Sequence, residues 1–199
     1  MAIEEPKYQV LSSDAPFEVR RYAPLLMAEV LVDGDMDDAS NKGFRLIADY
    51  IFGNNQNADN PASSKIAMTA PVTVIPQSTK ISMTAPVTIE PQSAQPDLGS
   101  INTWRVYFVM PSQYTLNTIP KPKNKAVNLR EVPEKYVLVL TYSGFNSAAK
   151  VQRLSDEALA WSNANGMKVI GTPQLARYDP PWTLPMFRRN EIMVDIAAP

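Results

Sequence analysis

Apolar and polar residues alternate with a period of two along much of the chain, which indicates strands rather than helices. The alternation predicts short strands over residues 7–11, 17–22, 25–32, 101–110, 127–132, 136–142, 169–178 and 191–196. Gly171 and Pro173 lie inside the 169–178 segment, so we expect that strand to be bent.

Two other segments have the three-to-four-residue spacing of an amphipathic helix. The first covers residues 37–52, and its apolar stripe consists of Phe44, Ile47, Ala48 and Ile51. The second starts at a cap, Asn146 or Ser147, and extends to about residue 163. Strands, a helix and strands follow one another twice. This order predicts an α+β fold made of two strand–helix–strand–strand units.

One nine-residue segment occurs twice. Residues 65–73 read KIAMTAPVT and residues 80–88 read KISMTAPVT, so the copies differ only at Ala67 and Ser82. Each copy alternates as a strand does, and the residues between them predict a turn, so we expect a hairpin. Pro71 and Pro86 lack a backbone donor, which predicts an edge position or a bulge. A duplicated core hairpin would explain this repeat without any role in function.

Composition narrows the possible chemistry. The chain has 199 residues, 45% of them hydrophobic and 20% charged, which suits one soluble domain over 1–199 with its own core. The net charge is −1 and no basic run occurs, so we expect no nucleic-acid binding. The sequence has no cysteine and no histidine, which excludes disulfides, thiolate nucleophiles and imidazole metal ligands.

No membrane-spanning stretch or signal peptide is evident, so we expect a cytoplasmic protein, or a periplasmic or secreted one if a signal has been removed. The glycines form no phosphate loop, and no serine lies in a nucleophile elbow. These patterns favour a binding protein over an enzyme.

The repeated KIxMTAPV string resembles the signature of the SOUL/heme-binding-protein family, and its doubling resembles bacterial members. Other motifs match in order from about residue 6 to residue 197. They are FEVRRY at 17–22, WRVYFVMP at 104–111, IPKP at 119–122, YDPPWT at 178–183 and RRNEI at 188–192. The resemblance implies a distorted antiparallel β-barrel of about eight strands with two flanking helices related by a pseudo-twofold, an architecture shared with GyrI-like effector-binding domains.

The resemblance also implies a tetrapyrrole cleft between the first helix and the loop before the last strand. The matching positions are Lys42, Phe44, Arg45, Ile47, Ala48, Ile51, Tyr178, Trp182, Phe187 and Arg188, with Arg189 beyond them. A porphyrin is a flat apolar plate with two carboxylates, so it needs an apolar slot and one or two cations. Packing against the sheet would explain the helix stripe equally well, and a packed loop would explain Trp182 and Phe187.

The absence of histidine changes what the resemblance implies for haem. The commonest axial ligand is missing, and Tyr178 and Met186 are the nearest substitutes by motif. We therefore expect haem, or another planar hydrophobic ligand, to be bound modestly, without redox turnover and without a metal site in the protein itself.

Glu191 is the remaining candidate. On the last strand it faces away from Ile192, so it could contact a cationic ligand in an effector-binding cleft. It could also act with Tyr178 as an acid or base in a hydrolytic or haem-degrading enzyme. An ion pair with Arg188 or Arg189 would leave it structural. A further alternative is a protein-interaction module that uses the proline-rich and Trp182 loops.

Overall fold

The computed structural model describes residues 4–57, 63–76, 102–180 and 182–199. Within these residues the helices are α1 (Met36–Ile51), α2 (Ala148–Ala164) and the 3-10 helix η2 (Pro185–Phe187). The strands are β1 (Tyr8–Asp14), β2 (Phe17–Tyr22), β3 (Leu25–Asp33), β4 (Asn55–Gln56), β5 (Val72–Pro76), β6 (Thr103–Val109), β7 (Lys121–Pro122), β8 (Asn128–Val132), β9 (Lys135–Tyr142), β10 (Gln174–Arg177) and β11 (Asn190–Ile196).

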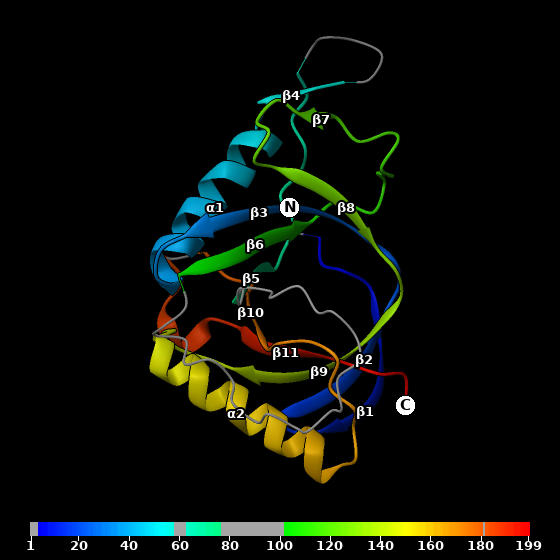
Figure 1. Ribbon diagram of the computed structural model, residues 1–199, viewed down its shortest axis with the longest axis vertical. Coiled ribbons are helices and arrows are strands. Elements are labelled where there is room, and N and C mark those ends of the chain that lie inside the picture. The colour runs from blue at the N-terminus through cyan, green and yellow to red at the C-terminus, as the bar shows by residue number, and fades with distance from the viewer. Residues whose placement is uncertain (1–3, 58–62, 77–101, 181) are drawn as a thin grey trace, which may run out of the picture.

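One large antiparallel sheet organises the described part of the chain. Its strand order is β1-β2-β9-β11-β10-β5-β6-β3-β8, and β4 and β7 form a separate pair. The sheet curls into a half-barrel, with α1 beside β3 and α2 beside β9 (Figure 1). The α+β class, the curled antiparallel sheet and the two flanking helices agree with the sequence-based expectation, although the sheet has nine strands and stays open between β1 and β8.

The expected repeat is visible in the strand order. The units β3-α1-β5-β6 and β9-α2-β10-β11 have the same connectivity, and their strands lie in mirrored order along the sheet. The two units meet where β5 pairs antiparallel with β10, at Val74↔Leu175, Thr73↔Ala176 and Val72↔Arg177. We call this β5–β10 pairing the seam, and it joins the two repeat units.

Both helices cover the same face of the sheet. Pairing between strands aligns one buried apolar row across this face: Val106, Val74, Leu175, Ile192 and Leu140. Helix α1 packs closely on β6 at Gly43. A Cβ added at this glycine would lie only 2.5 Å from Cβ of Val106. Side chains of Asp35 and Ser147 cap α1 and α2 by accepting backbone N–H groups. We call this face the helix face, and the opposite one the helix-free face.

Two strand predictions need correction. The segment 65–73 was expected to be a strand, but β5 begins only at Val72, after Pro71, which has no N–H for a ladder. Strand β5 is also an interior strand, paired on both sides, rather than an edge strand. The 169–178 segment is a strand only from Gln174, beyond Gly171 and Pro173. The second copy of the repeat lies outside the described residues.

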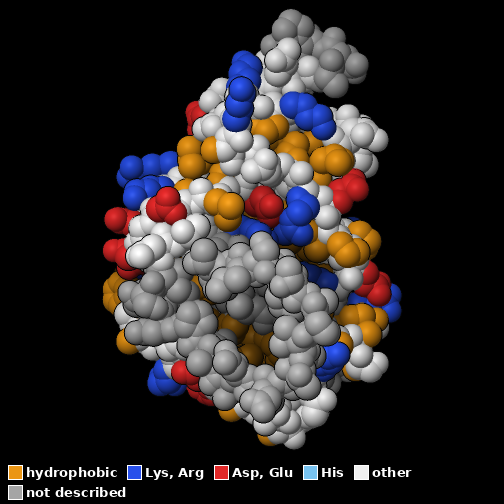
Figure 2. Space-filling view, in the orientation of Figure 1, with side chains coloured by type: hydrophobic (Ala, Val, Ile, Leu, Met, Phe, Trp, Pro, Cys, Tyr) orange, Lys and Arg blue, Asp and Glu red, His pale blue; other side chains and the backbone are white. Residues whose placement is uncertain are grey.

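On the face shown in Figure 2, basic and acidic side chains of the described residues are interspersed. None of the described helices is long and apolar enough to cross a membrane.

Candidate functional site

A row of mostly polar positions crosses the seam on the helix-free face. Strand pairing places Tyr107 opposite Thr73, Thr73 opposite Ala176, and Ala176 opposite Glu191. All four residues are at least 95% buried. Val74 and Ile192 face the helices. Because side chains alternate along a strand, the four residues of this row face the other side of the sheet, where they form a second buried region.

The centre of this second buried region is an ion pair between β2 and β11. Nη1 of Arg20 donates to both carboxylate oxygens of Glu191, at 3.0 and 3.1 Å, and its Nε donates to Glu18 at 2.7 Å. Burial alone would lower the pKa of Arg20, but the Glu191 carboxylate together with Tyr22 and Glu18 outweighs this effect, so the pKa is raised. This geometry thus makes Arg20 the ion-pair partner of Glu191, whereas Arg189 pairs with Glu5.

Tyr178 connects this ion pair to the loop before β11. Its hydroxyl donates to Glu191 at 2.5 Å, and burial, followed by the nearby carboxylate, raises its pKa. The guanidinium of Arg189 lies 3.6 Å from the centroid of the Tyr178 ring and pairs with Glu5 at 2.5 Å. Tyr178 and Arg189 therefore link the loop before β11 to the Arg20–Glu191 ion pair and to the N-terminal segment.

The N-terminal segment, residues 4–8, crosses the helix-free face. The backbone oxygen of Glu4 accepts from Ala70 N, and its carboxylate accepts from Ser112 N, both at 3.0 Å. The Tyr8 ring lies 5.2 Å from that of Tyr22 and 4.3 Å from the Arg20 guanidinium carbon. These contacts hold the segment above the buried row.

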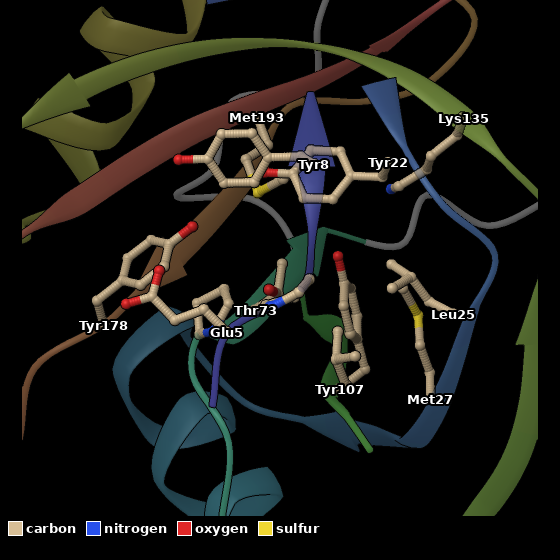
Figure 3. Close-up of a pocket in the computed structure, with 13 residues that line it drawn as sticks. Glu5, Tyr8, Tyr22, Leu25, Met27, Thr73, Tyr107, Lys135, Tyr178 and Met193 are labelled. Atoms are coloured by element: carbon tan, nitrogen blue, oxygen red, sulfur yellow. The ribbon is translucent and has the colours of Figure 1, made fainter. Parts of the chain in front are cut away.

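A small cavity remains beneath the segment. Its volume is about 20 Å³, and Figure 3 shows side chains from several strands converging on it. The lining includes four tyrosines and two methionines: Tyr8, Tyr22, Tyr107, Tyr178, Met27 and Met193. The space suits one water molecule and is far too small for a porphyrin.

Thr73 is the unusual polar group in this lining. It is 1% exposed, and within the described part of the chain its hydroxyl forms no hydrogen bond. The neighbouring Tyr107 hydroxyl instead donates to the side-chain oxygen of Gln174 at 2.8 Å. Burial raises the pKa of Tyr107, against smaller opposite effects of Lys135 and the adjacent Thr73 hydroxyl. The Thr73 hydroxyl is thus near enough to Tyr107 to lower its pKa, but it has no hydrogen-bond partner of ordinary geometry among the described residues.

The helix residues expected from the family resemblance lie elsewhere. Ile47, Ala48 and Ile51 are buried in the helix-face core, at 0%, 8% and 1% exposure, so they pack against the sheet. Phe44 is 38% exposed and contacts Phe108, with ring centroids 5.6 Å apart. Lys42 and Arg45 are exposed, and Nζ of Lys42 donates to Asp33 O at 3.2 Å.

The loop residues of the expected cleft project outward. Trp182 is 83% and Phe187 70% exposed, and both belong to an apolar group that we call the apolar loop: Trp182, Leu184, Met186 and Phe187. Arg188 lies 5.3 Å from the ring centroid of Phe145, which is itself 68% exposed. The packed-loop alternative therefore does not describe these side chains.

Helix α1 and the start of the loop do come together. Nη1 of Arg177, at the end of β10, donates to Ser40 Oγ at 3.2 Å, and its Nη2 pairs with Asp37 at 3.3 Å. Phe44 lies one turn beyond Ser40 on α1. Arg177 thus links the start of the loop to the first turns of α1, and of the expected positions Tyr178 lines the small cavity beneath the N-terminal segment.

Sequence analysis named Glu191 and Tyr178 of the helix-free site, but not Arg20, Thr73 or Tyr107. Period-two alternation does place Arg20 and Tyr22 opposite Phe17 and Val19, and that signal identifies their face. It carries no information on whether the N-terminal segment covers the face.

Among the described residues, no group of three or more carboxylates could hold a metal ion.

Comparison with known proteins identifies the family. A family model described as "SOUL heme-binding protein" matches residues 3–79 and 76–195, and the two matches meet between the copies of the repeat. The human protein "Heme-binding protein 2" is 28% identical over 158 residues, which are 76% of this chain. The match spans 65% of the human protein's length.

Solved structures share the fold at low identity. The crystal structure of the EcmrR C-terminal domain has a TM-score of 0.60 at 10% identity, covering 96% of this chain and 99% of that one. A structure titled as a hydrolase from Listeria innocua has a TM-score of 0.56 at 11% identity, covering 94% of each chain. Both show the fold alone. Because the family model matches nearly the whole sequence, the chain belongs to the SOUL heme-binding protein family.

Proposed function

We propose that this chain binds haem or another tetrapyrrole on the surface formed by the apolar loop and the exposed part of α1. The family is described as heme-binding, which supports a role in binding a small molecule. The observation that carries the proposal is the apolar loop itself, in which four large apolar side chains are 58–83% exposed. Clustered apolar surface of this kind typically marks a binding site.

The loop has a fixed shape although its side chains are exposed. Gly144 N donates to Pro185 O at 2.9 Å, Arg188 Nε donates to Thr183 O at 2.7 Å, and Arg189 N donates to Asp179 at 2.6 Å. Tyr178 is held at the base of the loop by Glu191. A preordered apolar surface loses little conformational entropy when a flat ligand covers it, which favours binding.

A cation on α1 could meet a carboxylate of such a ligand, because Arg45 is exposed and follows Phe44. A guanidinium can bind a carboxylate through two parallel hydrogen bonds. A porphyrin lying between loop and helix would thus meet apolar side chains on its faces and positive charge at its rim.

The protein offers few axial ligands for the iron of haem. The sequence has no histidine, and the Tyr178 hydroxyl is already engaged by Glu191. Met186 is 67% exposed and is the candidate thioether ligand. Binding would depend on burial of the macrocycle, so hemin and protoporphyrin IX should have dissociation constants of the same order. A cationic ligand at Glu191 is disfavoured because Arg20 already neutralises that carboxylate.

The test is a titration of the protein with hemin and with protoporphyrin IX, followed by Soret absorbance and tryptophan quenching. Trp104 is buried and Trp161 stacks on Phe17, so quenching should come chiefly from Trp182. Trp182→Ala and Phe187→Ala should each weaken both ligands by about ten-fold or more, since each removes roughly 1.5–3 kcal/mol of apolar burial.

Phe52→Ala is the matched control, because Phe52 is 57% exposed and lies beyond the end of α1. Met186→Leu keeps an apolar side chain of similar size but removes the thioether, so it should change the Soret band of bound hemin and leave protoporphyrin IX binding unaltered. The proposal is wrong if neither ligand saturates, or if Phe52→Ala weakens binding as much as Phe187→Ala does.

A further inference from the structure

A second, larger cavity adjoins the tyrosine-lined one beneath the N-terminal segment. The inner cavity has a volume of about 20 Å³ and the outer one about 150 Å³. Glu5, Pro6, Leu25 and Val109 line both, so they form the boundary between the two. The rest of the outer lining is largely apolar and includes Pro24, Leu26, Met110, Pro111 and Tyr114.

The two volumes match the two parts of a small aromatic molecule. In another protein, an apolar cavity of about 150 Å³ holds benzene, whereas about 10–15 Å³ is enough for one water molecule. The outer cavity is therefore large enough for a single aromatic ring. The inner one has room for a hydroxyl group but not for a second ring.

The inner cavity contains a polar group that lacks a partner. The buried Thr73 hydroxyl forms no hydrogen bond within the described residues, and such a group costs free energy unless something pairs with it. The Thr73 hydroxyl could donate a hydrogen bond to a ligand hydroxyl or accept one from it, because a hydroxyl does both. The oxygen of Tyr107, which already donates to Gln174, can accept as well.

Glu4, Glu5 and Lys7 line the outer cavity, and Glu5 and Lys135 line the inner one. Glu5 pairs with Arg189 at 2.5 Å and Lys135 with Asp195 at 2.8 Å. The Glu4 carboxylate accepts from Ser112 N, and hydrogen bonding to the side chain and, to a lesser extent, the backbone of Ser112 lowers its pKa, so it stays ionised at neutral pH. An anionic ligand would meet two carboxylates, Glu4 and Glu5, against the single cation Lys7 in the outer lining, which favours an uncharged ligand.

We infer that the two cavities together form a binding site for an uncharged, single-ring phenol-type compound. The ring occupies the outer cavity between Leu25 and Tyr114, and the hydroxyl enters the inner cavity and bonds to Thr73. This site lies under the N-terminal segment on the helix-free face and has no lining residue in common with the apolar loop, so it does not depend on the proposed tetrapyrrole site.

The test uses phenol, toluene and benzoate as probes, with binding followed by NMR titration of the full chain. Phenol should produce saturable shifts and contacts between its ring protons and the Leu25 methyl groups, and benzoate should bind more weakly. Thr73→Val keeps the shape and removes the hydroxyl. It should weaken phenol about five-fold or more, the loss expected for one hydrogen bond, and leave toluene within about two-fold.

Leu25→Trp should fill the outer cavity and abolish binding of phenol and toluene, whereas Leu31→Trp, at a position that is 59% exposed on the same strand, should not. The inference fails if phenol gives no saturable shift, if benzoate binds as well as phenol, or if Thr73→Val weakens both neutral probes equally. The ring-proton contacts of the unmodified protein decide the matter even if a variant does not fold.

Discussion

The Arg20–Glu191 ion pair predicts a large and specific loss of stability for Glu191→Gln. Arg20 and Glu191 have side-chain exposures of only 5% and 2%, and their atoms approach to 3.0 Å. The amide keeps the size of the carboxylate and can still accept from Tyr178, but it removes the charge that balances Arg20. Glu18 remains as a second partner of Arg20 at 2.7 Å.

The magnitude follows from the cost of leaving a buried charge without its partner. Removing one member of a buried pair costs about 3–5 kcal/mol. Because Glu18 compensates in part, we expect a loss of about 2–4 kcal/mol in the free energy of unfolding. For a chain of this length that corresponds to a fall in Tm of roughly 4–16 °C.

Urea unfolding, followed by circular dichroism and tryptophan fluorescence, measures the change. The matched control is Glu134→Gln, whose partner Arg21 lies 3.2 Å away at the surface with both side chains more than 40% exposed. That variant should lose no more than about 1 kcal/mol. The double variant Arg20→Met/Glu191→Met should be more stable than the sum of its single changes allows, because it leaves no uncompensated charge at the pair.

Two results would refute this reasoning. One is a Glu191→Gln variant that loses no more stability than Glu134→Gln. The other is strict additivity in the double variant, which would mean that Arg20 and Glu191 do not interact energetically.

Two further predictions concern the core and alkaline pH. Gly43→Ala should destabilise the fold by about 1–3 kcal/mol or more through overpacking, because the new Cβ would lie 2.5 Å from Val106; a thermal melt unchanged from the parent protein would contradict this. Burial raises the pKa of five tyrosines, Tyr22, Tyr50, Tyr107, Tyr142 and Tyr178. Above about pH 10 the unfolded chain loses these phenolic protons while the folded chain keeps them, so stability should fall as pH rises, and absorbance at the tyrosinate band should show that the five ionise only on unfolding.

The helices and the sheet halves could be predicted because their signals are local. The apolar stripe of α1 and the cap at Ser147 are set by side chains within a few residues of each other. The strand–helix–strand–strand repeat follows from element order, and the structure reproduces it. The family was likewise identified from short motifs that the family model confirms.

Prediction failed where the outcome depends on distant segments. Alternation over 65–73 indicated a strand, but the ladder begins at Val72, where β6 and β10 supply partners on both sides. Glu191 could be assigned to one face of its strand, but its partner Arg20 is 171 residues away in sequence. The cavities depend on how the N-terminal segment crosses the sheet, a contact that no local pattern encodes.

The seam between β5 and β10 has a consequence for how the two halves respond to a guest. Antiparallel neighbours are related by a local twofold axis, and here that axis runs close to the Thr73↔Ala176 pair. A molecule bound beside this pair would contact residues of both repeat units and so link them. Occupancy there would raise the force needed to pull the halves apart, so mechanical unzipping along the seam should report on binding directly.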